Sequence, residues 1–67
     1  MIKAPFNIGD VLINKYSYAT GVIERLDYRD SWYVLLAEGD EREWLAASTV
    51  MHQGWIPIDS PASAFRV

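Results

Sequence analysis

The sequence predicts a small all-β protein, a partly open barrel of about five short strands. An aromatic and branched run at 32–36 is followed by a polar break at 39–41 and a second apolar run at 44–46. This pattern is typical of two strands joined by a tight turn. Turn-forming residues recur elsewhere about every 8 to 12 residues, a spacing typical of a sandwich or barrel. A chain of 67 residues is too short for a seven-stranded sandwich, so the five-stranded barrel remains.

Length and composition limit how such a barrel is stabilised. A domain of 67 residues buries only about 60% of its unfolded surface, near the lower limit for independent folding. The chain has no cysteine and one histidine, so disulfides are excluded and neither a structural zinc site nor another cofactor is expected. The remaining routes are an aromatic core, drawn from the 13% of aromatic residues, or burial against another subunit.

The charge argues against a nucleic-acid partner. Nucleic-acid affinity depends mainly on a basic surface that neutralises phosphates, whereas this chain has a net charge of −3 and a pI near 4.8. No apolar run approaches the ~20 residues that span a membrane, and the first residues lack the apolar stretch of a signal peptide. We therefore expect a cytoplasmic protein with no membrane partner.

The first strand is predicted at 11–13, where three branched apolar residues follow a turn signal at 9–10. Phe6 and Ile8 are expected to fix the preceding segment to the core. Residues 14–18 are polar with two tyrosines, so we interpret them as a loop or an irregular hairpin arm.

The second strand is predicted at 19–28. With a period of two, Val22 and Leu26 point inward and Arg25 lies in water. Gly21 is expected at a bulge or sharp bend, which a small barrel needs at its corners.

The central strand is predicted at 32–38, with 42–46 paired back against it. Apolar residues occupy both parities of 32–38, which indicates that both faces are covered. The inward side chains are expected to be Trp32, Val34 and Leu36, and those on the half-covered face Tyr33 and Leu35.

Residues 47–53 are predicted to form a single helical or 3₁₀ turn. Ser48 is expected to cap it, with Val50 or Met51 packed inward. This turn precedes the last strand.

The last strand is predicted at 54–58. Pro57 cannot donate a hydrogen bond to a neighbouring strand, which indicates that this strand lies at a sheet edge or ends at Pro57. One domain is therefore expected at 1–59, followed by a flexible tail at 60–67.

Six short motifs cover most of residues 6–58: Phe6-x-x-Gly9-Asp10-x-Leu12, Thr20-Gly21-Val22-x-x-x-Leu26, Tyr33-Val34-x-Leu36-x-x-Gly39, Glu43-Trp44, Ser48-x-Val50 and Trp55-Ile56-Pro57. Their order resembles the SH3-like barrel class, in the broad sense that includes Tudor-like and KOW-like domains. The resemblance implies a five-stranded, partly open barrel with one short 3₁₀ or helical turn before the last strand.

A narrower similarity concerns true SH3 domains, which bind polyproline. Trp32-Tyr33 and Gly54-Trp55-Ile56-Pro57 are similar to their paired-aromatic and Gly-aromatic-aliphatic-Pro elements. The interval between the two elements is longer here, and the Ala-Leu-Tyr-Asp-Tyr motif of the first strand is missing. Ile58-Asp59 stands where SH3 domains have Asn-Tyr. Polyproline binding is therefore not inferred.

The best candidates for a partner-binding site are aromatic. Tyr16 and Tyr18 fall in the first loop, and rings gathered at a barrel mouth form a stacking platform or cation–π cage. Tudor-like relatives hold methylated lysine or arginine in such a cage, and the resemblance implies Tyr16, Tyr18, Tyr33 and Trp44 as its rings. Arg29 is added as a partner-binding side chain beside them. The alternative is that these rings pack the core.

The polar groups show no catalytic set. The acidic residues around the second hairpin turn lack EF-hand spacing and an apolar pocket, so we interpret them as a solvated turn. Arginines are expected in surface ion pairs. His52 has no second ligand or nucleophile at a suitable spacing, so we expect no enzyme activity.

Aromatic excess without catalytic residues favours a protein-interaction module that docks on a protein or peptide partner through an aromatic face. The small acidic chain also suits a regulatory or inhibitory accessory protein of a phage or mobile element. Two alternatives remain open: an obligate homo-oligomeric structural protein and, less favoured by charge, a barrel that binds single-stranded nucleic acid.

Overall fold

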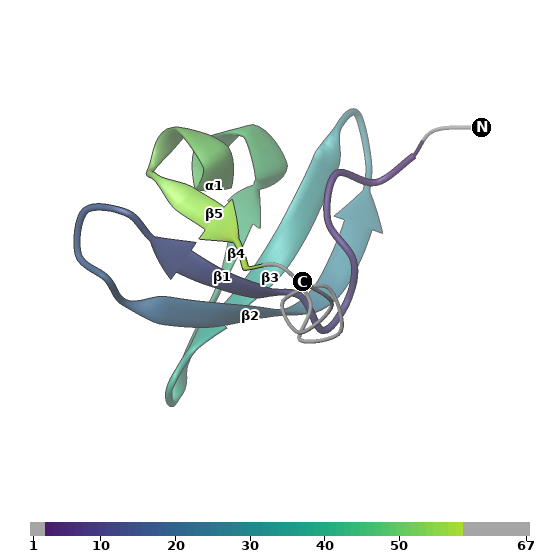
Figure 1. The fold of residues 1–67 in the computed structure, drawn as a ribbon. Helices are drawn as coiled ribbons and strands as arrows, with labels where there is room; N and C mark the ends of the chain where they lie inside the picture. Colours follow the sequence, from purple (N-terminus) through teal and green to yellow (C-terminus); the bar gives the residue numbers. More distant parts are fainter. Residues whose placement is uncertain (1–2, 59–67) are drawn as a thin grey trace, which may run out of the picture.

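Five antiparallel strands form one sheet in the computed structural model, which describes residues 3–58 (Figure 1). Along the sheet the strands follow the order β4-β3-β2-β1-β5. In chain order the elements are β1 (Val11–Asn14), β2 (Thr20–Tyr28), β3 (Trp32–Glu38), β4 (Glu41–Ala46), α1 (Ala47–His52) and β5 (Trp55–Pro57). The all-β class, the five strands and the helical turn before the last strand are confirmed.

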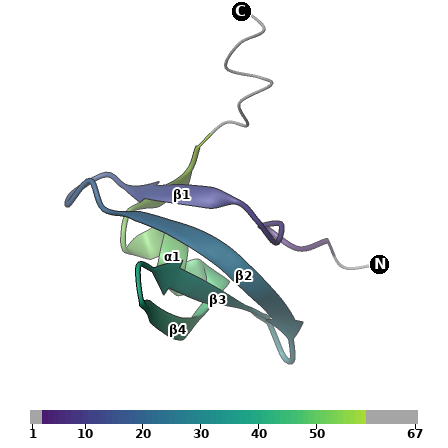
Figure 2. The same ribbon diagram turned by 90° about the horizontal axis from the view of Figure 1, so that it is seen from below.

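The sheet is strongly curved but not closed. β4 and β5 form its two edges and do not pair with each other within residues 3–58, while α1 links them across the open side (Figures 1 and 2). The predicted edge position of β5 is confirmed, since its one sheet neighbour is β1. Pro57 is its last residue, where a missing N–H costs the sheet little.

The core lies on the concave face of the sheet, under α1. Val34 and Leu36 of β3 are buried and Trp32 packs against them, as predicted for the inward face of the central strand. Tyr33 and Leu35 are half-buried, also as predicted. The buried core comprises Phe6, Leu12, Ile23, Val34, Leu36, Ala47, Val50 and Trp55.

The prediction for the inward face of β2 is wrong at Val22. Ile23 is fully buried, whereas Val22 is 38% exposed on the opposite face. The pairing of β2 with β3 shifts between Ile23 and Arg25, which makes Glu24 the extra residue of a β-bulge. Because a bulge reverses the alternation of side chains, Ile23 and Leu26 both meet the core although they are three residues apart.

Gly21 is therefore not the bulge residue that the sequence predicts. It lies on the concave face, where a Cβ would come within 2.9 Å of the Leu36 Cδ1 atom. Its missing side chain leaves room for Leu36, a core residue of the neighbouring strand β3. Gly21 therefore makes room for core packing, and the bulge in β2 lies at Glu24.

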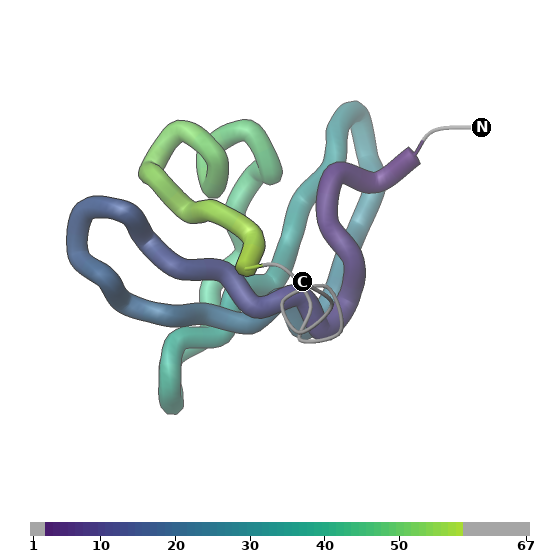
Figure 3. The backbone as a smooth tube through the Cα atoms, viewed as in Figure 1, coloured from purple at the N-terminus to yellow at the C-terminus, as the bar shows by residue number. Residues whose placement is uncertain are grey.

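The segment before β1 runs beside β2, as the tube in Figure 3 shows. The Gly9 amide donates to the Ile23 carbonyl at 2.7 Å, and the Ile23 amide donates to the Asp10 carbonyl at 2.9 Å. Phe6 is buried in the core as predicted, but Ile8 is 65% exposed, so the expectation that both residues fix this segment is wrong for Ile8.

α1 is a six-residue helix without a side-chain cap. Ala46 occupies the N-cap position, so the expected capping role of Ser48 is wrong. Val50 is fully buried and Met51 is 52% exposed, which decides between the two predicted core contacts. Since so short a helix is marginal alone, packing of Val50 and Ala47 stabilises it.

Some predictions concern residues outside the described part of the chain. The flexible tail expected at 60–67 lies there, and so does the end of the predicted 1–59 domain. Among residues 3–58, no helix has the length and apolar character needed to cross a membrane.

Candidate functional site

The loop between β1 and β2 displays the two most exposed aromatic rings of the described residues. Tyr16 is 72% exposed and Tyr18 is 76% exposed. The alternative that these rings pack the core is therefore wrong for both tyrosines. We call residues 14–19, from the last residue of β1 to the residue before β2, the tyrosine loop.

The Asn14 side chain holds the backbone of the tyrosine loop through hydrogen bonds. Its Oδ1 atom accepts hydrogen bonds from the amides of Tyr16 at 3.0 Å and Ser17 at 3.1 Å. Its Nδ2 atom donates to the carbonyl of Gln53 at 3.0 Å, 39 residues away in the chain. Asn14 is the one buried polar residue within residues 3–58, and these three bonds satisfy most of its side chain. The loop is thus tied to the end of α1.

Gly54 provides the surface against which the Tyr16 ring rests. A Cβ atom on Gly54 would come within 2.6 Å of two ring carbons of Tyr16, so the ring lies directly on the glycine backbone. The Lys15 amide also donates to the Gly54 carbonyl at 2.9 Å, and the Lys15 Nζ atom lies 5.2 Å from the Tyr16 ring centroid. One side of an otherwise exposed ring is therefore held in place.

Tyr18 has a backbone conformation that is uncommon for a residue with a side chain. Its φ angle is 63°, in the left-handed region. The Tyr18 amide donates to the Asn14 carbonyl at 2.7 Å, and the Asn14 amide donates to the Ala19 carbonyl at 2.8 Å. These two bonds close the loop and hold the strained residue with its ring in solvent.

Arg29 and Tyr33 lie together at a different place, beside the turn from β2 to β3. The Arg29 guanidinium carbon is 5.6 Å from the centroid of the Tyr33 ring, within cation–π range. Its Nε atom donates to Asp27 Oδ2 at 2.9 Å, and this hydrogen bond raises the pKa of Arg29 above its ordinary value. The expected surface ion pairing of arginines is confirmed at Arg29.

Trp44 lies on β4, directly opposite Leu35 of β3, and is 46% exposed. Tyr33 lies two residues before Leu35 in β3 and therefore faces the same convex side of the sheet. Trp44 and Tyr33 thus belong to one outer surface.

The structure does not gather the four predicted rings into one cage. Tyr18 precedes the first residue of β2, whereas Tyr33 pairs with Asp27 near the other end of that strand. About seven extended residues separate the two places, which corresponds to roughly 20 Å. Tyr16 and Tyr18 form one group, and Tyr33, Trp44 and Arg29 form another.

A patch of branched aliphatic side chains that was not predicted from the sequence lies on the convex face, along β1, β2, β5 and the residue after β5. Val11 pairs with Val22, Ile13 pairs with Ile56, and the Ile58 amide donates to the Val11 carbonyl. Four of these side chains are 38–46% exposed: Val11, Val22, Ile56 and Ile58. We call these four residues the aliphatic patch. The missed signal is the apolar run at 11–13, which occupies both parities as 32–38 does.

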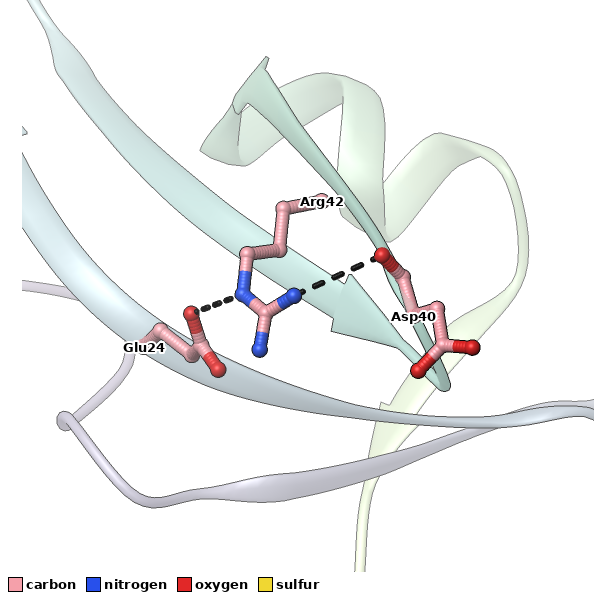
Figure 4. A network of polar contacts seen from close by, with 3 residues as sticks. All are labelled: Glu24, Asp40 and Arg42. Atoms are coloured by element: carbon pink, nitrogen blue, oxygen red, sulfur yellow. Dashed lines mark hydrogen bonds and ion pairs between the residues drawn. The ribbon is translucent and has the colours of Figure 1, made fainter.

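An ion pair separates the aliphatic patch from Trp44. Arg42 of β4 reaches across β3 to Glu24 of β2, and its Nε atom donates to Glu24 Oε1 at 2.8 Å (Figure 4). This hydrogen bond raises the pKa of Arg42. Ala37, directly opposite Arg42, is 8% exposed although it is on the convex face.

The acidic residues of the β3–β4 hairpin line an open hollow of about 420 Å³, together with Arg42. Three carboxylates contribute to it: Glu38, Glu41 and Glu43. Within residues 3–58 no group of three His, Cys, Asp or Glu side chains has the geometry to hold a metal ion.

No family model, curated protein or solved structure matches this chain. What the protein can bind must therefore be inferred from its own surface. The described surface has three features: two exposed rings on a hydrogen-bonded loop, a convex aliphatic patch and an acidic strand edge.

Proposed function

We propose that the protein is a non-catalytic interaction module that docks on a partner protein or peptide through the tyrosine loop. The exposure of Tyr16 and Tyr18 on an extensively hydrogen-bonded loop is the observation that supports this function most directly. Tyrosine offers a large contact area with few rotatable bonds, and it is enriched among the residues that dominate binding energy. A loop that is already ordered loses little entropy when a partner binds.

We further propose that the fold is an SH3-like, partly open barrel. The strand order β4-β3-β2-β1-β5 and the short helix between β4 and β5 support this assignment. The concave core under α1 supports it as well. In such a barrel, loops at one end are free to vary and to bind without disturbing the core.

The test removes both rings without removing the bonds that hold the loop. Tyr16→Ala combined with Tyr18→Gly keeps Asn14 and Gly54 in place, and glycine accepts the positive φ of position 18. We expect the far-UV circular dichroism spectrum to be unchanged and capture of the native partner from the source cell to be abolished. Met51→Ala, which shortens another exposed apolar side chain, is the matched control and should retain the partner.

Two results would contradict this function. Retention of the same partner by the double variant would place the binding site elsewhere, and Trp44→Ala would then test the second aromatic group. Loss of the folded spectrum would assign the tyrosines to stability and not to binding.

A homo-oligomeric structural protein is the second candidate, and the aliphatic patch is the observation that favours it. Its four exposed side chains contain no charge; three lie on adjacent strands, and Ile58 directly follows β5. Burial of such a patch against a second copy would remove apolar surface from water. This would add stability to a short chain, which buries a smaller share of its surface on its own than a longer chain does. Light scattering at micromolar concentration should then show a dimer that Ile56→Lys converts to a monomer. A monomer for the unmodified chain would exclude this candidate.

A further inference from the structure

The edge of the sheet along β4 has no neighbouring strand within residues 3–58 (Figure 2). Glu38 and Glu41 flank the two-residue turn and form the pair that closes the hairpin. Hydrogen bonds alternate along an antiparallel pair, so Arg42 and Trp44 direct their backbone N–H and C=O groups away from β3. Outside the strand ladders, the amides of Arg42 and Trp44 donate to no backbone carbonyl of residues 3–58. An unpaired edge of this kind is a template for another extended segment.

The two sides of this edge differ in chemistry. Trp44 lies on the convex side and is 46% exposed. Glu41 and Glu43 alternate with it and therefore lie on the opposite side, where with Glu38 they line the open hollow. Glu38 and Glu41 are directly opposite each other across the two strands, an arrangement in which like charges repel.

No ion pair within residues 3–58 neutralises these carboxylates. Arg42 borders the hollow, but its Nε atom is bonded to Glu24 and its Nη1 atom donates to the Asp40 carbonyl at 3.4 Å. The two ion pairs found within residues 3–58 are Arg29–Asp27 and Arg42–Glu24, and neither involves a carboxylate of the hollow. A cationic group from another molecule would relieve the repulsion.

We propose that the β4 edge binds an extended segment of a partner protein that has basic residues at alternate positions. The segment adds a strand to the sheet through the backbone groups of Arg42 and Trp44. Its lysine or arginine side chains face Glu41 and Glu43, and its intervening apolar side chains lie over Trp44. This second surface is independent of the tyrosine loop.

The same charges argue against the other occupants. Pairing β4 with β4 of a second copy would bring Glu41 and Glu43 of both molecules to a common edge, and the repulsion would increase. Phosphates of a nucleic acid would be repelled by the same carboxylates. The charge therefore favours a basic peptide segment.

The experiment titrates the full chain, labelled with ¹⁵N, with three synthetic seven-residue peptides. The first alternates lysine and valine, the second has the same composition with the lysines in one block, and the third alternates glutamate and valine. We expect the first peptide alone to protect the amides of Arg42 and Trp44 from hydrogen exchange. A block of lysines cannot place all its charges on one side of a strand.

Two matched variants test the charge contribution. Glu43→Gln should weaken binding of the lysine–valine peptide by about twofold to fivefold, the range of an exposed ion pair. Asp30→Asn changes the net charge equally at an exposed turn and should leave the affinity unchanged.

Three results would overturn the proposal. Equal binding of the block peptide would indicate non-specific attraction, and binding without protection of the Arg42 and Trp44 amides would place the peptide elsewhere. Protection that rises with protein concentration in the absence of peptide would show that a second copy occupies the edge. The variant with Tyr16→Ala and Tyr18→Gly should still bind the peptide, so failure of this proposal is separate from failure of the tyrosine-loop function.

Discussion

The β1–β2 and β3–β4 hairpins end in loops that differ in how they are held. The tyrosine loop is bonded internally through Asn14 and externally to Gln53 and Gly54. The turn between β3 and β4 has two residues, Gly39 and Asp40, and a Cβ on Gly39 would meet no atom within 4 Å. The longer loop, which exposes the larger side chains, is thus the more extensively bonded one. Exposure of a side chain and looseness of its backbone are separate properties.

The proposed binding function accounts for this difference. The short turn needs no support because two residues are enough to reverse a twisted antiparallel pair. The tyrosine loop is longer than strand reversal requires, and its bonds hold rings that add nothing to the core. A binding loop benefits from such bonds because ordering it on association would otherwise cost affinity.

The strongest test of the comparison is Gly54→Ala. We expect a loss of about 3 kcal/mol in the free energy of unfolding, because the φ angle of 95° disfavours a side chain and the new Cβ meets the Tyr16 ring. Urea denaturation measures the loss. Adding Tyr16→Ala should recover part of it, since the clashing atoms belong to that ring. Strict additivity of the two changes would show that the ring does not rest on Gly54.

Asn14→Ala should have the next largest effect, a loss of about 2–3 kcal/mol. The change removes three hydrogen bonds and leaves the amides of Tyr16 and Ser17 without their acceptor. Asn7→Ala, at an exposed asparagine, is the control and should stay within about 0.5 kcal/mol. If both variants unfold at the same urea concentration, the tyrosine loop is no better held than a free turn.

Gly39→Ala examines the other hairpin and should cost only about 1 kcal/mol. The φ angle of 59° disfavours alanine, but no neighbouring atom obstructs its Cβ. Thermal unfolding followed by circular dichroism gives the comparison with Gly54→Ala. A loss as large as that of Gly54→Ala would mean that backbone strain alone explains both glycines.

Tyr18→Gly should have the smallest effect and the opposite sign, a gain of about 0.5 kcal/mol. Glycine relieves the strain of the 63° φ angle, and its greater freedom in the unfolded chain offsets part of the gain. Ala19→Gly, next to it outside the left-handed region, should be destabilising. Destabilisation by Tyr18→Gly would show that the exposed ring contributes to the fold.

Several elements were predictable because their signals are local. The β3–β4 hairpin follows from an apolar run, a Gly-Asp turn and a second apolar run. The helical turn before an edge strand ending at Pro57 follows from similar short patterns. The inward face of β2 was not predictable, because the bulge at Glu24 is defined by pairing with β3 and reverses the alternation within one strand.

The candidate site was predictable in part. Tyrosines in a polar loop indicate exposure, and this is confirmed for Tyr16 and Tyr18. Nothing local indicates that Gly54 supports the Tyr16 ring, since the two residues are brought together by the pairing of β1 with β5. The division of the four predicted rings into two groups depends on the length of β2 in the same way.

The order of apolar runs and turn residues alone determined that this chain forms five short strands with one helical turn, because each signal acts between residues close in sequence. The buried face of β2, the bonding of the tyrosine loop and the open edge along β4 were decided only when the strands paired. These properties depend on contacts between residues far apart in the chain, such as the bond from Asn14 to Gln53.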